Sequence, residues 1–450
     1  MNKNRIAAAL ILCAVPNALL ASGFALIEVN GRGQGNAYAG ATAHTPDAST
    51  IFFNPAGMMM LQEDQISVAA HLILPKSSFN NDGSSSADVL GPVPLTGDED
   101  DGGFNAFIPN FYWVTELENE MKFGLGVNTP FGLAVKYDDD WVGRYHGVIS
   151  DLSSININPS LAYRVNDKVS FGGGVNVMLA KVELSSAVDF GAVCVGSLNQ
   201  ATCEDLGSLP QEADGLVEFD ADNFDQLGLG FNLGVLFEVS NVTNLGVAFR
   251  SEIEIETEGE ADFTVPASSS FVFGTGAFVD SDISADVSLP ASLSFSGSHR
   301  RGKITYLADI TWTGWSSFDE LRIEYDNPAQ PDSVTTEDWD DTFRYSLGLD
   351  YQYSDKLILR TGLAYDETPI PSPERRTPRL PGADRTWLSF GASYQYSKQL
   401  SFDAGYSHLF IDDPEINNEF ESSIPTLAST LKGDYEASVD IISVQLNWQY

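Results

Sequence analysis

The chain has 450 residues, of which 43% are hydrophobic, and its 63 acidic against 24 basic side chains give a net charge of −39. So few lysines and arginines exclude a nucleic-acid partner in practice, because phosphate binding needs clustered cations. After the N-terminal segment, no stretch reaches the roughly 18 uninterrupted apolar residues that a membrane-spanning helix requires.

Residues 1–21 have the layout of a secretory signal peptide. Lys3 and Arg5 form a short basic region, and an apolar run of about ten residues follows before small residues close the segment at Ala21 and Ser22. We expect cleavage after Ala21, with Ser22 as an equally permissible end. The apolar run is too short to span a bilayer, so the mature protein is expected to be exported.

Residues 22–63 do not alternate between polar and apolar side chains. They are mostly small and apolar, are punctuated by glycines, and end in Phe53-Asn54-Pro55-Ala56-Gly57. Disordered tails are polar, so this composition predicts a hatch packed inside the structure that follows. A flexible periplasmic tail is the alternative.

Residues 64–450 repeat one pattern, a segment of about ten residues with alternating polarity followed by a turn, which is typical of membrane-spanning strands. In the last segment Ile442, Val444, Leu446, Trp448 and Tyr450 share one face, and polar residues share the other. Short connections alternate with long ones. The short ones are Glu116–Glu120, Val165–Lys168, Ser240–Asn244, His299–Lys303, Ser354-Asp355 and Ser397–Gln399, and the long ones lie near 75–103, 138–152, 189–224, 258–285, 326–341, 367–384 and 416–433.

These connections predict an all-β fold, a transmembrane barrel of fourteen antiparallel strands with both ends in the periplasm. A soluble β-sandwich would also alternate. Three features favour the barrel: the strict alternation of short and long connections, polar faces rich in Gly, Ser and Asn, which suit a crowded lumen, and aromatic residues at the strand ends, where interfacial girdles form. The aromatic residues are Tyr163, Trp312, Tyr353, Tyr365, Tyr396, Trp448 and Tyr450.

The mature sequence resembles the FadL/TodX family of outer-membrane transporters of long-chain fatty acids and other hydrophobic compounds. The resemblance follows the chain in order from the hatch to the late strands. It is carried by Ser22-Gly23-Phe24-Ala25-Leu26, Gly35-Asn36-Ala37-Tyr38-Ala39-Gly40, Asn54-Pro55-Ala56, Asn128-Thr129-Pro130-Phe131-Gly132-Leu133-Ala134, Phe249-Arg250-Ser251-Glu252 and Arg360-Thr361-Gly362-Leu363-Ala364-Tyr365-Asp366.

Family membership implies a route for the substrate. It would land in an apolar groove between the third and fourth external loops, move to an inner site, and leave sideways at a kink in the third strand. The resemblance assigns Phe24, Lys181 and Arg322 to ligand binding. It assigns Asn54, Pro55 and Ala56 of the hatch, with Pro130, Phe131 and Gly132 of the third strand, to the lateral gate.

The residues themselves support a gate at Pro130. Proline lacks a backbone N–H and removes a ladder bond from a sheet, and Gly132 adds bending freedom. Because a closed barrel has no edge, a proline inside the strand at 121–137 marks a place where the wall could open. A harmless bulge is the alternative, and Asn54-Pro55-Ala56 could equally be a turn that starts the first strand.

The inner site needs a cation, since an unpaired buried carboxylate is costly. The apolar positions switch phase on either side of Lys181, so a bulge near Ala180 would turn this lysine inward. The alternative is a lysine that extends to the outer interface. Arg322 lies between Leu321 and Ile323 and could instead form a salt bridge with Glu324 or Glu183.

Cys194 and Cys203 are close in one loop and are expected to form a disulfide in an oxidising compartment. We expect no metal, no cofactor and no enzymatic activity, because the five histidines have no spacing that suggests a metal site and no nucleophile–base constellation stands out. The external groove is expected from residues 186–224 and 258–285, whose apolar residues include Val188, Phe190, Val193, Leu198, Leu206, Leu209, Leu216, Phe263, Phe271, Val272, Phe273 and Phe278.

The sequence thus predicts a monomeric transporter in the outer membrane of a Gram-negative bacterium, surrounded by lipid and lipopolysaccharide. It would move long-chain fatty acids by passive diffusion. A channel for aromatic or alkane hydrocarbons is the alternative within transport. A water-filled porin and a structural or phage-receptor barrel are the alternatives outside it.

Overall fold

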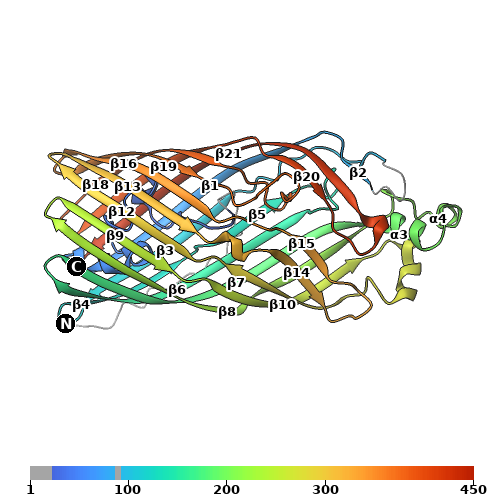
Figure 1. Ribbon diagram of the computed structural model, residues 1–450, viewed down its shortest axis with the longest axis horizontal. Helices are drawn as coiled ribbons and strands as arrows, with labels where there is room; N and C mark the ends of the chain where they lie inside the picture. Colours follow the sequence, from blue (N-terminus) through green and yellow to red (C-terminus); the bar gives the residue numbers. More distant parts are fainter. Residues whose placement is uncertain (1–22, 87–92) are drawn as a thin grey trace.

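The computed structural model describes residues 23–86 and 93–450, so the expected signal peptide lies outside the described range. The molecule is an elongated β-barrel (Figure 1). Its C-terminus lies at the end that carries the short turns, while the short helices α3 (Phe190–Ser197) and α4 (Gln200–Leu206) lie at the opposite end. No helix in these described ranges is long and apolar enough to cross a membrane.

Fourteen antiparallel staves form the wall, where a stave is one passage of the chain and contains one strand or two consecutive strands. The barrel closes because β1 pairs with β3 on one side and with β21 on the other. The staves are, in order, β1 (Gln65–Asn81), β3 (Ala106–Glu116), β4 (Met121–Asn128) with β5 (Gly132–Lys136), β6 (Ile149–Asn166), β7 (Val169–Asp189), β8 (Asp214–Ser240), β9 (Thr243–Arg250) with β10 (Ile253–Thr264), β11 (Ser281–Leu289) with β12 (Ser292–Arg301), β13 (Ile304–Thr313) with β14 (Glu320–Tyr325), β16 (Thr342–Ser354), β17 (Leu357–Asp366), β18 (Arg385–Gln395), β19 (Leu400–Ile411) and β21 (Ser429–Gln449). Three short strands, β2 (Ser85–Ser86), β15 (Ser333–Thr336) and β20 (Glu415–Glu419), pair with β21, β14 and β21 respectively.

Alternation along the strands separates a lipid-facing surface from the lumen. In β16 the side chains of Phe343, Tyr345 and Leu347 are exposed, while Arg344 and Ser346 between them are buried. This period of two places apolar groups toward the bilayer and polar groups inside, as a membrane barrel requires. The predicted fold class and strand count are therefore confirmed.

The short turns fall where the sequence predicts them, but the first, third and fourth external loops are shorter than expected. In the first, predicted at 75–103, β1 continues to Asn81. The segment predicted as loop 189–224 already becomes strand β8 at Asp214, and the segment predicted as loop 258–285 continues strand β10 to Thr264. The acidic residues in these stretches alternate with less exposed residues along the lengthened strands, as in the exposed Glu258 and Glu260 of β10.

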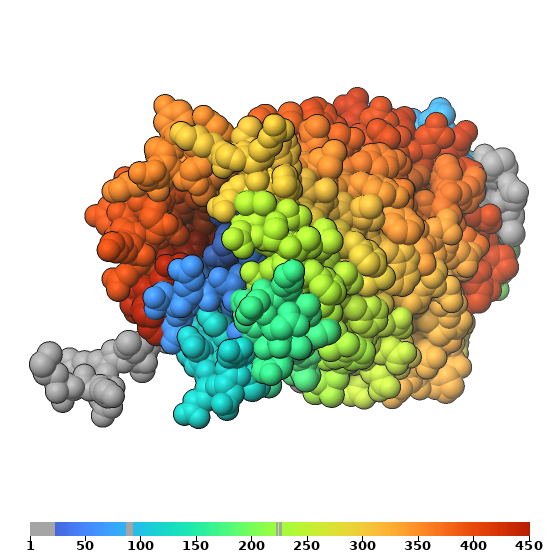
Figure 2. Space-filling view, turned by 60° about the vertical axis from the view of Figure 1, so that its left-hand side comes forward, coloured from blue at the N-terminus to red at the C-terminus, as the bar shows by residue number. Residues whose placement is uncertain are grey.

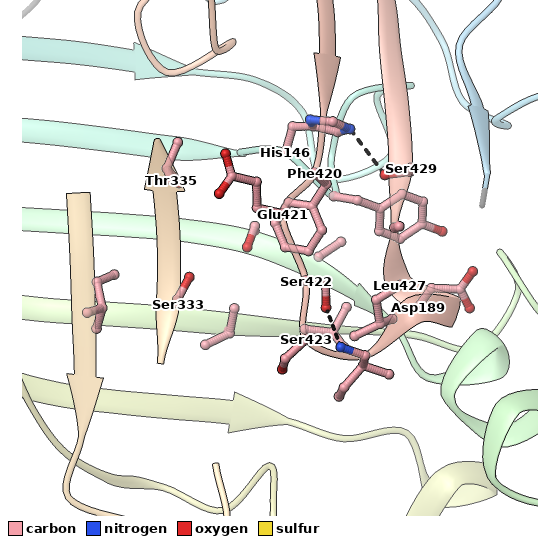
Figure 3. A pocket seen from close by; sticks show the side chains of 18 of the residues that line it. His146, Asp189, Ser333, Thr335, Phe420, Glu421, Ser422, Ser423, Leu427 and Ser429 are labelled. Carbon is pink, nitrogen blue, oxygen red and sulfur yellow. Dashed lines mark hydrogen bonds between the residues drawn. The ribbon is translucent and has the colours of Figure 1, made fainter. Parts of the chain in front are cut away.

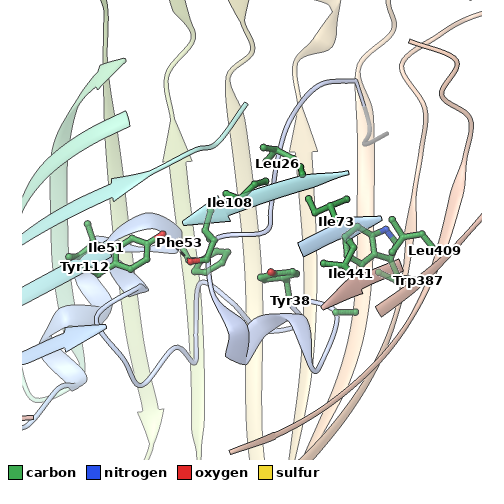
Figure 4. Close-up of a cluster of buried hydrophobic side chains, with 14 of the residues drawn as sticks. Leu26, Tyr38, Ile51, Phe53, Ile73, Ile108, Tyr112, Trp387, Leu409 and Ile441 are labelled. Atoms are coloured by element: carbon green, nitrogen blue, oxygen red, sulfur yellow. Dashed lines mark hydrogen bonds between the residues drawn. The ribbon is translucent and has the colours of Figure 1, made fainter. Parts of the chain in front are cut away.

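Residues 23–63, here called the hatch, occupy the lumen. The hatch contains three short helices, α1 (Gly31–Gln34), α2 (Thr50–Phe53) and η1 (Pro55–Met60). Its apolar side chains pack against inward-facing wall residues (Figure 4), with Leu26, Tyr38, Ile51 and Phe53 of the hatch facing Ile73, Ile108, Tyr112, Trp387, Leu409 and Ile441 of the wall.

Polar bonds also fix the hatch to the wall. Arg32 forms an ion pair with Asp350 of β16 at 2.7 Å, and the Gln34 amide donates to the Ser407 hydroxyl of β19 at 2.6 Å. Gly35 touches Gly391 of β18 so closely that a Cβ at Gly35 would lie 2.8 Å from the Gly391 Cα. The apolar composition of the hatch is thus explained by burial inside the barrel rather than by a free tail.

Candidate functional site

The third stave is interrupted at Pro130, and its neighbour β3 loses its partner there. Toward β6 the pairing resumes at once, with Asn128 opposite Asn156 and Gly132 opposite Ser153. Toward β3 the last ladder pair is Phe111 with Val127, and within the described ranges the next bridge is Gly103 with Val135. We call the unpaired region between 104–110 and 128–134 the wall break.

The start of the hatch covers the wall break from inside. The Leu26 N–H donates to the Pro130 carbonyl at 2.8 Å, and the Gly132 N–H donates to the Phe24 carbonyl at 2.9 Å. On the other edge, the Asn110 amide donates to the Glu28 carbonyl at 3.2 Å. Residues 24–29 therefore bond to both edges and satisfy backbone groups that would otherwise be buried without partners.

Asn54, Pro55 and Ala56 bond to and pack on other strands of the wall. The Asn54 amide donates to the Val235 carbonyl of β8 at 3.0 Å, and a Cβ at Gly172 of β7 would lie 2.3 Å from the Ala56 nitrogen. The motif therefore packs on β7 and β8, where inward glycines leave room for it. The expectation that it holds the wall break is corrected: the hatch residues bonded to Pro130 and Gly132 are Phe24 and Leu26.

An inner cavity of about 1140 Å³, including the space at its mouth, lies between the hatch and the wall. It reaches the wall break, because Pro130 and Phe131 line it. The rest of its surface combines apolar side chains with a few charged ones, and its lining includes Ala25, Leu26, Ile27, Phe52, Phe53, Pro55, Leu233, Phe249, Trp315 and Trp387 with Glu28, Arg250, Asp309, Arg344 and Asp366.

Arg344 of β16 is the charged group in this cavity that is best placed to bind an anion. It is 7% exposed, its Nη2 donates to the Ala37 carbonyl at 3.0 Å, and its guanidinium carbon lies 5.0 Å from the centre of the Trp387 ring. Its Nε and Nη1 have no hydrogen-bond partner among the described residues. A buried cation with two free donors in a largely apolar cavity has the chemistry to accept a carboxylate.

The acidic groups of the cavity leave Arg344 available. Asp366 forms an ion pair with Arg385 at 3.1 Å, and Asp309 accepts hydrogen bonds from the hydroxyls of Ser296 and Thr311. Arg250, the second cation, already donates to Asn176 and to the Phe52 carbonyl.

Glu28 is the acidic group of the hatch in this cavity. Burial raises its pKa to about 7, although Arg385 and Arg344 act in the opposite direction. Below about pH 7 the docked hatch therefore favours the neutral form of Glu28, which a solvent-exposed glutamate has already lost above pH 4.5.

We predict that hatch docking weakens as the pH rises. Between pH 4.5 and about 7 the docked Glu28 keeps a proton that the free residue has lost. The contribution of this proton to the docking free energy is therefore full below this window and is lost as the pH rises through it. The whole change corresponds to about 3 kcal/mol. Hydrogen exchange of residues 23–34, corrected for intrinsic rates, should show more protection at pH 5 than at pH 8, and Glu28→Gln should remove the difference. Equal pH dependence in the variant would contradict this assignment.

An outer groove lies at the loop end of the barrel (Figure 3). Val188, Phe263 and Phe278 line it as predicted, while Phe190, Val193 and Val272 pack in the adjoining core cluster and Leu198, Leu206 and Phe273 are exposed. Sequence reasoning missed the other walls. They come from β14 and from the last loop, and include Leu321, Ile323, Tyr325, Phe420, Glu421, Ile424 and Leu427.

An apolar layer separates the outer groove from the inner cavity. Leu321 lines the groove and packs on this layer, while Phe131 and Trp315 belong to the layer and line the cavity. Phe24 of the hatch sits in its middle, with ring centroids 4.8 Å from Trp315 and 6.2 Å from Phe131. The layer and the wall break thus share Phe24 as a common contact.

Lys181 and Arg322 do not line the inner cavity. A register shift does occur beside Ala180, but the extra residues belong to β8, and β7 stays in uninterrupted register with β6. Because Ala180 and Val182 pack on luminal clusters, Lys181 between them faces outward. Leu321 and Ile323 line the outer groove, so Arg322 points away from it and pairs with Glu320 at 2.8 Å and with Asp332 at 3.1 Å. The geometry therefore contradicts the expected inward position of both cations.

Cys194 and Cys203 form a disulfide with an S–S distance of 2.06 Å. The bond joins α3 to α4 at the tip of the loop, next to the cluster that backs the outer groove. Across residues 23–86 and 93–450, no group of three or more His, Cys, Asp or Glu side chains could hold a metal ion.

Comparison with known proteins identifies a family and several relatives of this chain. A family model described as outer membrane protein transport protein (OMPP1/FadL/TodX) matches residues 12–450. Outer membrane protein P1 of Haemophilus influenzae is 29% identical over 100% of this chain and 99% of its own length. The long-chain fatty acid transport protein of Salmonella typhi is 30% identical over 89% of this chain and 91% of its own.

Solved structures share the fold. A Pseudomonas aeruginosa FadL homologue superposes with a TM-score of 0.83 at 23% identity, covering 95% of this chain and 99% of that one. The Pseudomonas putida toluene transporter TodX superposes with a TM-score of 0.68 at 16% identity, again covering 95% and 99%.

Proposed function

The chain belongs to the OMPP1/FadL/TodX family of outer membrane transport proteins, and from this membership we propose that it carries long-chain fatty acids by passive diffusion to a lateral opening in its wall. Its relatives place it in the outer membrane of Gram-negative bacteria as a transport channel rather than an enzyme. Fatty acids are the proposed substrates, and the wall break is the proposed exit.

The route follows the apolar surfaces in order. A fatty acid first lies in the outer groove, where burial of its chain contributes about 25 cal/mol per Å² of apolar surface. It then passes the layer around Phe24 into the inner cavity. The hatch segment 24–29 would have to leave the wall break before the chain could slide out between β3 and β5.

The observation that carries the choice of substrate is Arg344. Its free Nε and Nη1 face an apolar cavity, and a carboxylate on a long chain satisfies both properties of that cavity. A toluene molecule would leave the guanidinium without a partner. Hydrocarbon transport remains the second candidate, favoured by the structural likeness to TodX and the apolar lining of both sites.

Growth tests separate the two substrates. Expressed in a bacterium that lacks its own long-chain fatty acid transporter, the chain should restore growth on oleate. In a strain that degrades toluene but lacks a transporter for it, the chain should give little gain at limiting toluene. The reverse pattern would favour the hydrocarbon channel.

Conductance measurements test the two alternatives to a hydrophobic-compound transporter, a water-filled porin and a structural barrel. The hatch packs on the inner wall and obstructs the lumen, so the protein in a planar bilayer should pass no large steady current, whereas a water-filled porin would. A purely structural barrel would give neither current nor growth on oleate.

A further inference from the structure

The lipid-facing surface of the barrel contains a hollow that transport does not require. One row of paired residues crosses five neighbouring strands in register, with Gly297 of β12 opposite Ala308 of β13 and Ala308 opposite Leu347 of β16. The row continues to larger side chains on both sides, Leu245 of β9 and Leu363 of β17. Two small residues between leucines leave a depression in the wall.

The hollow has an open volume of about 1200 Å³. A Cβ added at Gly297 would meet only the Leu245 Cδ2, at 3.4 Å, so nothing in the protein fills the space. Its rim is strongly exposed: Leu347 is 67% exposed and Leu363 is 55% exposed. Such side chains belong to the hydrocarbon belt of the barrel, so a lipid chain is what covers them in the membrane.

The turn below the hollow is unusually basic for this chain. It joins β12 to β13 and carries Arg300, Arg301 and Lys303, all exposed, around Gly302, whose φ of +61° suits the tight reversal. Within the described ranges none of these three cations forms an ion pair with an acidic side chain. The Arg300 guanidinium donates to the Asn241 carbonyl at 3.3 Å, which holds it over the neighbouring turn.

The other periplasmic turns do not concentrate positive charge. The turn from Glu116 to Glu120 is acidic, and three further turns carry single lysines, Lys168, Lys356 and Lys398. Figure 2 shows the segment near residue 300, in yellow, projecting at the rim of this end of the barrel. In a protein of net charge −39, three unpaired cations on one turn require a specific explanation.

We propose that this face binds one anionic glycerophospholipid of the periplasmic leaflet, with its phosphate on Arg300, Arg301 and Lys303 and an acyl chain in the hollow. Arg301 lies four positions after Gly297, which corresponds to about 13 Å along a strand and lies within the length of one acyl chain. Basic groups at the membrane surface attract anionic headgroups. His299 and Thr243, hydrogen-bonded to each other at 2.9 Å, form the polar edge between turn and hollow.

Lipid retention tests the proposal on the full-length protein. The barrel is reconstituted in nanodiscs of mixed phosphatidylglycerol and phosphatidylcholine, transferred to a mild detergent, and analysed by native mass spectrometry. We expect the wild type to retain one phosphatidylglycerol and to prefer it over phosphatidylcholine by at least about tenfold.

Two variants address the two halves of the site, and a third is the matched control. R300S/R301S/K303S removes the charges, and G297L/A308L fills the hollow with apolar side chains that a membrane face tolerates. K168S/K356S/K398S removes the same number of cations from three other turns. We expect the first two variants to lose the retained lipid and the control to keep it.

If the control variant lost as much bound phosphatidylglycerol as R300S/R301S/K303S, net charge alone would explain the loss, and the proposed site would be wrong. Retention by G297L/A308L would overturn the role of the hollow, and equal retention of both lipids by the wild type would overturn the anionic specificity. Heat-modifiable migration on gels confirms that each variant is folded. Oleate uptake is expected to be unchanged in all three variants, so the outcome is independent of the transport proposal.

Discussion

Arg344→Met should lower the affinity for oleate by about tenfold to 100-fold, since a hydrogen bond to a charged group is worth roughly 1.5–3 kcal/mol. Arg344 faces the inner cavity with two free donors, and methionine keeps most of the side-chain volume while removing the charge. The affinity for oleyl alcohol, which has the same chain and no carboxylate, should change little. Fluorescence displacement or calorimetry with the purified protein measures both ligands.

The controls separate charge from structure. Arg344→Lys keeps the positive charge, although it loses the bond to Ala37 and the stacking on Trp387, and should retain part of the oleate affinity. Arg322→Met removes a cation whose guanidinium already pairs with Glu320 and Asp332 outside the cavity, and should leave oleate binding unchanged. Equal losses for oleate and oleyl alcohol in Arg344→Met would show that Arg344 supports the cavity rather than binding the carboxylate.

The barrel could be predicted from the sequence because its main signal is local. Alternation within single strands reports the lipid face and the lumen face directly, and short turns follow from residues such as Asn166-Asp167 and Ser354-Asp355. The interruption at Pro130 was predictable for the same reason, because proline removes a ladder bond wherever it stands in a sheet.

The inner cation that we propose, Arg344, was not predicted from the sequence, because the phase of apolar residues around Lys181 is misleading. A switch in apolar phase there indicates a bulge in β7, but Val182 and Leu184 are apolar because they face clusters inside the barrel. The inward position of Arg344 could have been predicted from the sequence. Arg344 lies between the exposed Phe343 and Tyr345, so plain alternation places it in the lumen.

Contacts between segments that are distant in the sequence could not be predicted. The groove wall supplied by the last loop, and the pairing of Phe24 and Leu26 with the wall break, join segments more than 100 residues apart. Neither alternation nor turn residues encode which loop folds over which opening. The hatch was predictable as a buried segment, but its exact partners were not.

A disulfide that holds the hatch on the wall break should stop transport. Ala25 and Phe131 form an antiparallel bridge flanked by the bonds from Leu26 to Pro130 and from Gly132 to Phe24. This is a non-hydrogen-bonded pair, in which the Cα atoms lie about 4.5 Å apart, within the range that a disulfide spans. Ala25→Cys with Phe131→Cys, in a background with Cys194 and Cys203 replaced by alanine, gives one possible bond.

Each cysteine has its own control. Ala25→Cys alone and Phe131→Cys alone report the cost of the substitutions, and the second matters more because Phe131 packs against Phe24. The parent without Cys194 and Cys203 reports any effect of oxidant or reductant on the cells. The double variant in its reduced form reports transport without the cross-link and with the same side chains changed.

Oleate uptake by cells carrying this double variant, measured before and after reduction, tests lateral exit through the wall break most directly. The oxidised protein should transport at least about tenfold more slowly than the reduced protein, because flux scales with the fraction of molecules whose wall break is open. Reduction should restore the rate of the single variants. Equal uptake in both states, with the cross-link shown complete by mass, would mean that the fatty acid leaves by another path and that the hatch segment at Phe24 does not gate it.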